Sequence, residues 1–127
     1  MSELTDVNGH RNGEIEIVSR RLQEGIVLAV SGEVDLATAR SVEHELLWAE
    51  RSHEVVVLDL TETSFMDSTG LQMVIAASRR LRRRGRRLLI VEGPPQIRRL
   101  FELTHVADHL ELVQDAAELD RAIATTR

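Results

Sequence analysis

The sequence predicts one α/β domain: a small, mixed, mostly parallel sheet of four or five strands with about four helices packed on it. Short apolar runs typical of buried strands alternate with segments whose apolar residues recur every three or four positions, as on one face of a helix. Two strands come first, then three helix–strand pairs and a last helix, and strands separated by helices pack as parallel neighbours. A chain of 127 residues is long enough to bury one such core.

The beginning of the chain predicts a hairpin at one edge of the sheet. Residues 1–13 are polar and aperiodic, so we expect a flexible leader before a domain that spans residues 14–125. Two strands follow, at residues 14–22 and 25–32, joined by a short turn.

Continuous apolar and β-branched runs at residues 54–60 and 87–91 predict two central parallel strands that are covered on both faces. A helix that begins at Ala39 precedes the first of them, with Asp35 or Thr38 as its N-cap. A second helix, with its apolar residues on one face, lies between the two strands.

The rest of the chain continues the alternation of helices and strands. Gly85 is the expected C′ residue of the second helix. A third helix is predicted at residues 94–103, a last strand at 109–113 and a fourth helix at 115–124.

Composition narrows the class of protein. The chain has no cysteine, so it has neither a disulfide framework nor a thiolate metal site, which fits a reducing compartment. His105 and His109 have a zinc-like spacing but fall in an expected loop and strand rather than on a helix. No apolar run approaches the ~18 residues that cross a bilayer, and the amino terminus has no signal-peptide pattern. We therefore expect a cytoplasmic protein without a metal ion or cofactor.

Arginines concentrate near the end of the second helix, where seven of the nine residues 79–87 are arginine although the net charge of the chain is −5. Cations at a helix carboxyl end offset the negative end of its dipole, so a solvated helix end is the first interpretation. A patch for an acidic protein and a patch for nucleic acid are alternatives that the clustering leaves open.

The stretch SFMDSTGL places Asp67, Ser68, Thr69 and Gly70 between the end of a predicted strand and the start of a predicted helix. Open α/β folds carry their functional loops at this edge of the sheet. Ser68 would lie at or near the N-cap, and Gly70 would let another surface approach the backbone. Ser68 could merely cap the helix, act as a nucleophile, help the helix end bind an anion or nucleotide, or accept a covalent mark.

The sequence lacks residues that a nucleophilic or nucleotide-binding role of the Ser68 segment would require. The G-x-S-x-G elbow is absent because Met66 occupies the position of its first glycine. A chain without lysine can complete neither a P-loop nor a phosphoaspartate receiver built on Asp59. A phosphoserine suits a helix N-terminus, whose N–H groups and dipole favour an anion. At a contact surface the same charge beside Asp67 would oppose binding, which is how a switch of association works.

Three segments together resemble the STAS-domain anti-anti-sigma factors of bacteria: SGEVDLATA at residues 31–39, SFMDSTGL at 64–71 and PPQIRRLFELTHV at 94–106. The resemblance extends over about residues 14–125. It implies a four- or five-stranded sheet with helices on one side, and a non-enzymatic regulator of transcription that switches partners.

In that family the unphosphorylated protein binds an anti-sigma factor, usually a serine kinase with a GHKL-type ATP site, and thereby releases a sigma factor. Phosphorylation ends the association, and a PP2C-type phosphatase restores it. The resemblance therefore implies that Ser68 is the phosphorylated residue, that Asp67, Thr69 and Gly70 shape its loop, and that Asp35 is a neighbouring partner contact.

Two points stay open at this stage. Many family members have a second serine where this chain has Thr69, so Thr69 is a second candidate for the mark. The alternative function is a non-switching STAS scaffold or transporter accessory subunit, in which Ser68 only caps a helix. Neither function requires direct contact with nucleic acid.

Overall fold

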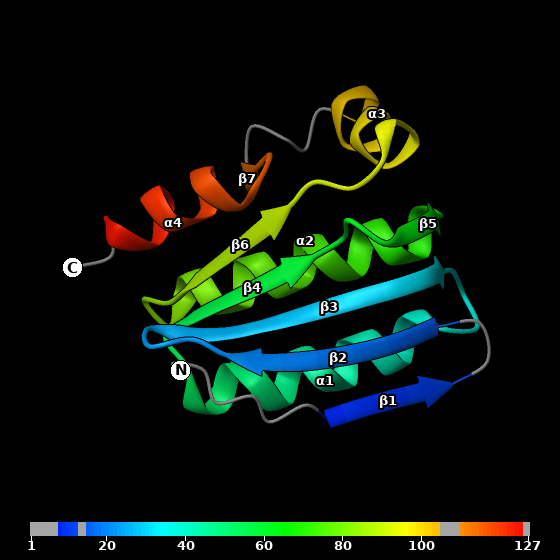
Figure 1. Ribbon diagram of the computed structural model, residues 1–127. Helices are drawn as coiled ribbons and strands as arrows, with labels where there is room; N and C mark the ends of the chain where they lie inside the picture. The colour runs from blue at the N-terminus through cyan, green and yellow to red at the C-terminus, as the bar shows by residue number, and fades with distance from the viewer. Residues whose placement is uncertain (1–7, 13–14, 105–109, 126–127) are drawn as a thin grey trace.

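The computed structural model describes residues 8–12, 15–104 and 110–125, which form one sheet with helices on both of its faces (Figure 1). In chain order the elements are β1 Asn8–Asn12, β2 Ile15–Arg21, β3 Gly25–Val34, α1 Ala39–Ser52, β4 Val55–Asp59, β5 Thr63–Met66, α2 Ser68–Arg83, β6 Arg87–Val91, α3 Pro95–Leu103, β7 Glu111–Val113 and α4 Ala116–Ala124.

The sheet has the order β1-β2-β3-β4-β6-β7, and β5 pairs with β3 outside this path. The pairs β1–β2 and β2–β3 are antiparallel, whereas β3–β4, β3–β5, β4–β6 and β6–β7 are parallel. The predicted mixed, mostly parallel sheet is confirmed.

Two strands of the described chain were not expected. Asn8–Asn12 pair with β2, so the expectation of a flexible leader is wrong for these residues. Their sequence, NGHRN, has no apolar alternation and so gave no strand signal; the strand forms through backbone pairing with the edge of β2. β5 is only four residues long, too short for a periodic signal. The expected domain start at residue 14 stays a prediction.

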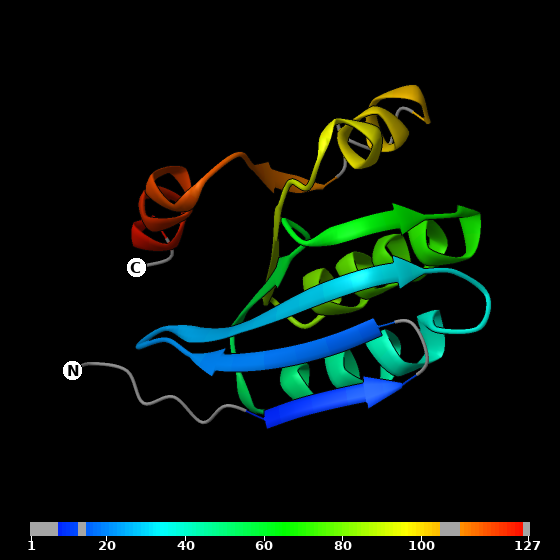
Figure 2. The same cartoon turned by 45° about the vertical axis from the view of Figure 1, so that its right-hand side comes forward.

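Alternate side chains of the central strands enter two separate cores. Val56 and Leu58 of β4 face the larger core, which also contains residues of α1, α2 and α3. Val55 and Val57 face the smaller core, which α4 closes with Leu119 and Ile123. The expectation that the helices lie on one side is therefore wrong for α4, which covers the opposite face (Figure 2). Strands apolar on both faces need such a double cover.

A buried ion pair links the C-terminal ends of α1 and α2. Glu50 of α1 is only 1% exposed and accepts two hydrogen bonds from the Arg80 guanidinium, at 2.7 Å from Nε and 2.8 Å from Nη2. Arg86 donates to the backbone carbonyl of Glu50. Arg80 and Arg86 of the arginine cluster thus link α2 to α1 and are not part of a solvated helix end.

Candidate phosphorylation and partner-binding site

Asp67 begins α2 at the edge of the sheet formed by the carboxyl ends of the parallel strands. It is the N-cap residue, with extended backbone angles, and its Oδ1 accepts from the N–H groups of Thr69 at 2.9 Å and Gly70 at 3.1 Å. Its carbonyl accepts the first helical bond, from the Leu71 N–H at 3.0 Å. One carboxylate oxygen therefore occupies two of the N–H groups that a helix start leaves unpaired.

Ser68 is the first residue of α2, and its side chain is exposed. The cap is Asp67, so the idea that the Ser68 hydroxyl serves as the cap is wrong. Within the described part of the chain no hydrogen bond engages that hydroxyl. Thr69 is half-buried one residue further on. Of the two adjacent hydroxyl residues, Ser68 is the more exposed.

Asp35 organises the turn that leaves β3. Its Oδ1 accepts from the N–H groups of Ala37 at 3.0 Å and Thr38 at 3.2 Å, while its own N–H donates to Thr38 Oγ1 at 3.0 Å. Thr38 Oγ1 also donates to the carbonyl of Glu33 at 2.6 Å. Thr38 is the N-cap residue of α1, but its side chain makes no capping hydrogen bond. Asp35 and Thr38, the two candidate caps, instead hold this turn together by their hydrogen bonds to each other.

Pairing between β3 and β5 brings the two loops together. The strands are parallel with Val34 opposite Met66, so the residues that follow them, Asp35 and Asp67, leave the sheet next to each other. The Asp67 N–H donates to the Val34 carbonyl at 3.1 Å. The predicted neighbourhood of Asp35 with the Ser68 loop thus follows from strand register.

Gly70 is buried at this junction and does not offer an open backbone. A Cβ built on it would lie 2.8 Å from Met66 Cγ, 2.9 Å from Val34 Cγ1 and 3.1 Å from the Val34 carbonyl oxygen. The surface that approaches Gly70 is the chain's own β3–β5 end, which corrects the expectation of a close approach by another surface. Gly70 shapes the Ser68 loop from within.

Exposed apolar side chains, which sequence reasoning missed, surround this edge. Leu36, Phe65 and Leu103 are 79%, 47% and 70% exposed. Between β5 and α3 lies a shallow, mostly apolar groove of about 230 Å³, lined by Phe65, Met66, Gln96, Ile97, Arg99, Leu100 and Leu103. Their signal was weak because an apolar residue in the sequence is not marked as exposed or buried until the elements are packed. Phe65 and Met66 directly precede Asp67, so the groove adjoins the Ser68 loop.

Two further carboxylates follow parallel strands at the same edge of the sheet. Glu92, which follows β6, forms an ion pair with Arg98 at 3.4 Å. Burial raises the pKa of Glu92 above its ordinary value, and this effect outweighs the lowering by Arg98. Asp59, at the end of β4, accepts from the Thr61 N–H at 3.0 Å.

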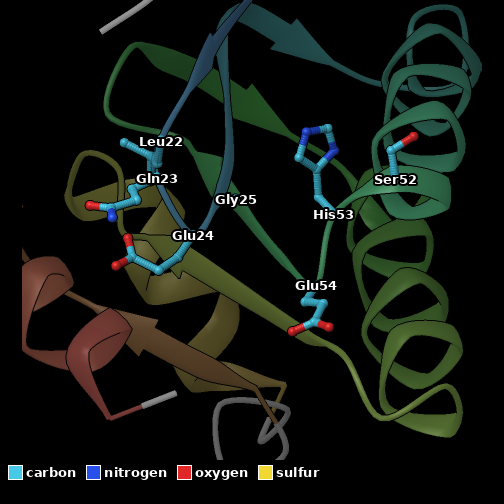
Figure 3. A pocket seen from close by; sticks show the side chains of 7 residues that line it. All are labelled: Leu22, Gln23, Glu24, Gly25, Ser52, His53 and Glu54. Atoms are coloured by element: carbon cyan, nitrogen blue, oxygen red, sulfur yellow. The ribbon is translucent and has the colours of Figure 1, made fainter. Parts of the chain in front are cut away.

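A second pocket lies at the opposite edge of the sheet. It has a volume of about 510 Å³ and is open to solvent between the β2–β3 turn and the segment joining α1 to β4 (Figure 3). Its lining comprises Leu22, Gln23, Glu24, Gly25, Ser52, His53 and Glu54. It shares no residue with the Ser68 site. Among the described residues no group of three or more histidine or acidic side chains could hold a metal ion; His105 and His109 lie outside them.

Comparison with known families agrees with this architecture. A family described as the STAS domain matches residues 16–119. This chain belongs to the STAS family. The match includes both the Asp35 turn and the Ser68 loop, and it begins after β1.

Two similar proteins are named as anti-sigma factor antagonists. It is 36% identical over 110 residues to the anti-sigma-B factor antagonist of Listeria monocytogenes, covering 86% of this chain and 96% of the relative. It is also 31% identical over 83 residues to a protein of Bordetella bronchiseptica named as a putative anti-sigma factor antagonist, covering 64% of this chain and 72% of that one.

Solved structures share the fold. An anti-sigma factor antagonist from Mycobacterium paratuberculosis matches with a TM-score of 0.78 and 25% identity, covering 87% of this chain and 94% of that one. The phosphorylated form of the Bacillus protein SpoIIAA matches with a TM-score of 0.61 and 18% identity, covering 95% of this chain and 99% of that one. In the described residues, no helix of this STAS domain is both long and apolar enough to cross a membrane.

Proposed function

We propose that this STAS domain is an anti-sigma factor antagonist controlled by phosphorylation of Ser68. The unphosphorylated form binds an anti-sigma factor that is also a GHKL-type serine kinase, and this binding releases a sigma factor. The kinase transfers the γ-phosphoryl group of ATP to Ser68 Oγ, leaving ADP, and the association ends. A PP2C-type phosphatase hydrolyses the phosphoserine and restores binding. The domain itself acts in the cytoplasm as a binding partner, not as an enzyme.

The observation that carries the proposal is the separation of two roles at the start of α2. Asp67 provides the cap, which leaves the Ser68 hydroxyl exposed for a kinase. A mark on Ser68 removes no hydrogen bond of the described fold, so the phosphorylated domain can keep its structure. The solved phosphorylated SpoIIAA has the same fold, which supports this point.

The surroundings of Ser68 favour a contact surface whose affinity a phosphate would lower. Exposed Leu36, Phe65 and Leu103 supply apolar area of the kind found in the centre of protein interfaces. Asp35 and Asp67 flank the same spot. A phosphoserine carries about −1.5 to −2 charges at neutral pH. Its repulsion and desolvation then oppose docking of a partner that accommodates the neutral hydroxyl.

The test is intact-mass spectrometry after incubation with ATP and candidate anti-sigma kinases from the same genome. We expect a gain of one phosphate in the wild type and none in Ser68→Ala, with Thr69→Ala as the matched control that still gains it. Phosphate retained in Ser68→Ala and lost in Thr69→Ala would transfer the role to Thr69. No transfer by any active kinase would favour the non-switching scaffold or transporter accessory subunit.

A further inference from the structure

The end of the domain opposite the Ser68 site carries an open pocket between two segments that are distant in the sequence. The pocket has a volume of about 510 Å³ and lies between the β2–β3 turn and the residues that join α1 to β4 (Figure 3). Glu24 extends from the turn, and Glu54 and His53 belong to the joining residues. Two carboxylates of different segments therefore line one pocket.

The turn from α2 to β6 lies beside this pocket. The Arg87 N–H donates to the Glu54 carbonyl at 2.9 Å, and Arg86 donates to the carbonyl of Glu50 near the end of α1. Arg84, the C-cap residue of α2, begins this turn, and its side chain is exposed. Positive and negative side chains therefore occupy the same end of the domain.

The fold does not use the side chains of Glu54 and Arg84. Within the described part of the chain, neither makes an ion pair or a side-chain hydrogen bond, although both are exposed. Arg80 and Arg87, in the same arginine cluster, pair with carboxylates of other elements. Contacts between elements thus account for those two arginines but not for Arg84.

An exposed aromatic side chain adjoins the pocket. Trp48 of α1 is 43% exposed, and its ring lies against that of His53, with the centroids 6.2 Å apart. Exposed ion pairs alone contribute little binding energy, so an association at this end needs apolar contact as well. Tryptophan is among the residues most enriched at the positions that dominate binding energy in protein interfaces.

We propose that this end of the domain binds a second copy of the chain about a twofold axis, with Arg84 of each copy contacting Glu54 at the other copy's pocket. In a twofold interface both copies use the same patch, so each contact occurs twice. Guanidinium and carboxylate groups can pair through two parallel hydrogen bonds. We call the patch formed by Trp48, His53, Glu54 and Arg84 the dimer surface.

The mixture of charges favours a second copy over other occupants of the dimer surface. An acidic segment would meet the Glu54 carboxylate, and a basic segment would meet the Arg84 guanidinium. Nucleic acid binds through several phosphate contacts to a positive surface, which Glu54 interrupts. A matching partner must present both signs, and a twofold-related copy presents them at the required positions by symmetry.

Ser68 stays accessible in such a dimer. Figure 1 shows the β2–β3 turn at one end of the sheet and β5, which leads to Ser68, at the other. Arg84 is sixteen residues after Ser68, about 24 Å at the helical rise of α2. One dimer therefore presents two Ser68 loops that face away from the dimer surface. The inference does not rest on the proposed phosphorylation switch.

Sedimentation equilibrium of the whole chain over a range of protein concentrations tests the dimer. We expect a reversible dimer that weakens as salt is added. Glu54→Arg and Arg84→Glu should each weaken it roughly tenfold or more, because either change places two pairs of like charges opposite each other. Glu102→Arg, an exposed change on α3 at the other end, should alter the dissociation constant less than about twofold.

An equimolar mixture of Glu54→Arg and Arg84→Glu distinguishes contacts between copies from contacts within one copy. In the mixed dimer both contacts again join opposite charges, so the mixture should associate about as strongly as the wild type. The double variant Glu54→Arg/Arg84→Glu should do the same, with circular dichroism confirming the fold of each protein. A monomer at every concentration, larger oligomers, an equal loss in Glu102→Arg, or no recovery in the mixture would overturn the proposal.

Discussion

The backbone N–H of Asp67 donates to the carbonyl of Val34 at 3.1 Å, and this bond joins the start of α2 to the end of β3. The loop that presents Ser68 is therefore continuous with the sheet, and the Asp35 turn starts at the same point. Two loops far apart in the sequence become one surface because their strands are parallel and in register.

For the switch itself, we expect Ser68→Ala to retain affinity for the anti-sigma partner and Ser68→Asp to weaken it at least roughly tenfold, because a carboxylate places charge where a neutral hydroxyl was accommodated. Calorimetric titration against the kinase identified by phosphate transfer measures both. Thr69→Asp, one residue away and half-buried, tests whether any nearby charge suffices. Equal affinities of the Ser68 variants would count against the switch.

Asp67→Ala should destabilise the domain by about 1 kcal/mol, because it deprives the Thr69 and Gly70 N–H groups of their acceptor. Asp67→Asn keeps an acceptor oxygen at the cap and should lose much less. Urea unfolding followed by circular dichroism gives both values. If the two variants are equally stable, the cap contributes nothing measurable.

Gly70→Ala should cost about 1–3 kcal/mol, because the added methyl group meets Val34 and Met66 at less than 3 Å. Val34→Ala removes one of these obstacles, so the double variant should be more stable than the sum of the two single changes predicts. The double-mutant cycle by urea unfolding checks this coupling. Additive effects would show that the loop moves aside freely.

Arg80→Ala should destabilise the domain by about 3–5 kcal/mol, because Glu50 would stay buried without its counter-charge. The hydrogen bond that Arg80 donates to Glu50 raises the pKa of the Arg80 guanidinium above its usual value, so Arg80 keeps its charge. Replacing both residues, as Glu50→Leu/Arg80→Met, should recover stability relative to Arg80→Ala. Thermal unfolding of the three proteins tests the order.

Glu92 should weaken the fold as pH rises. Because burial raises its pKa above the ordinary value of 4.5, the folded state binds a proton more tightly than the unfolded chain does. Its contribution is therefore lost as pH increases from about 4.5 through the raised pKa. Glu92→Gln should flatten this part of the stability profile, measured by urea unfolding across pH, whereas exposed Glu54→Gln, at the opposite edge of the sheet, should not. A steeper profile in Glu92→Gln would contradict the assignment.

Elements with strong local signals were predictable. β4 and β6 are continuous apolar runs, and the predicted C′ residue Gly85 is confirmed, since it adopts a φ of 71°. Asp115, the first residue of the predicted fourth helix, is its N-cap, and its Oδ1 accepts from the Glu118 N–H. Such signals reside in a few consecutive residues. β1 was not predictable, because its stability comes from pairing and not from its side-chain pattern.

The sequence by itself determined the fold class, the position of Ser68 at a helix start, and the resemblance to the STAS family, because periodicity, capping residues and short motifs are local properties. The three-dimensional structure decided that Asp67 and not Ser68 is the cap, that Gly70 packs against Val34, and that α4 covers the opposite face. It also decided which arginines form ion pairs with other elements. The last three depend on which distant segments meet, whereas the cap depends on the extended backbone angles at Asp67. Strand register and side-chain packing fix those meetings, and neither can be read from one segment alone.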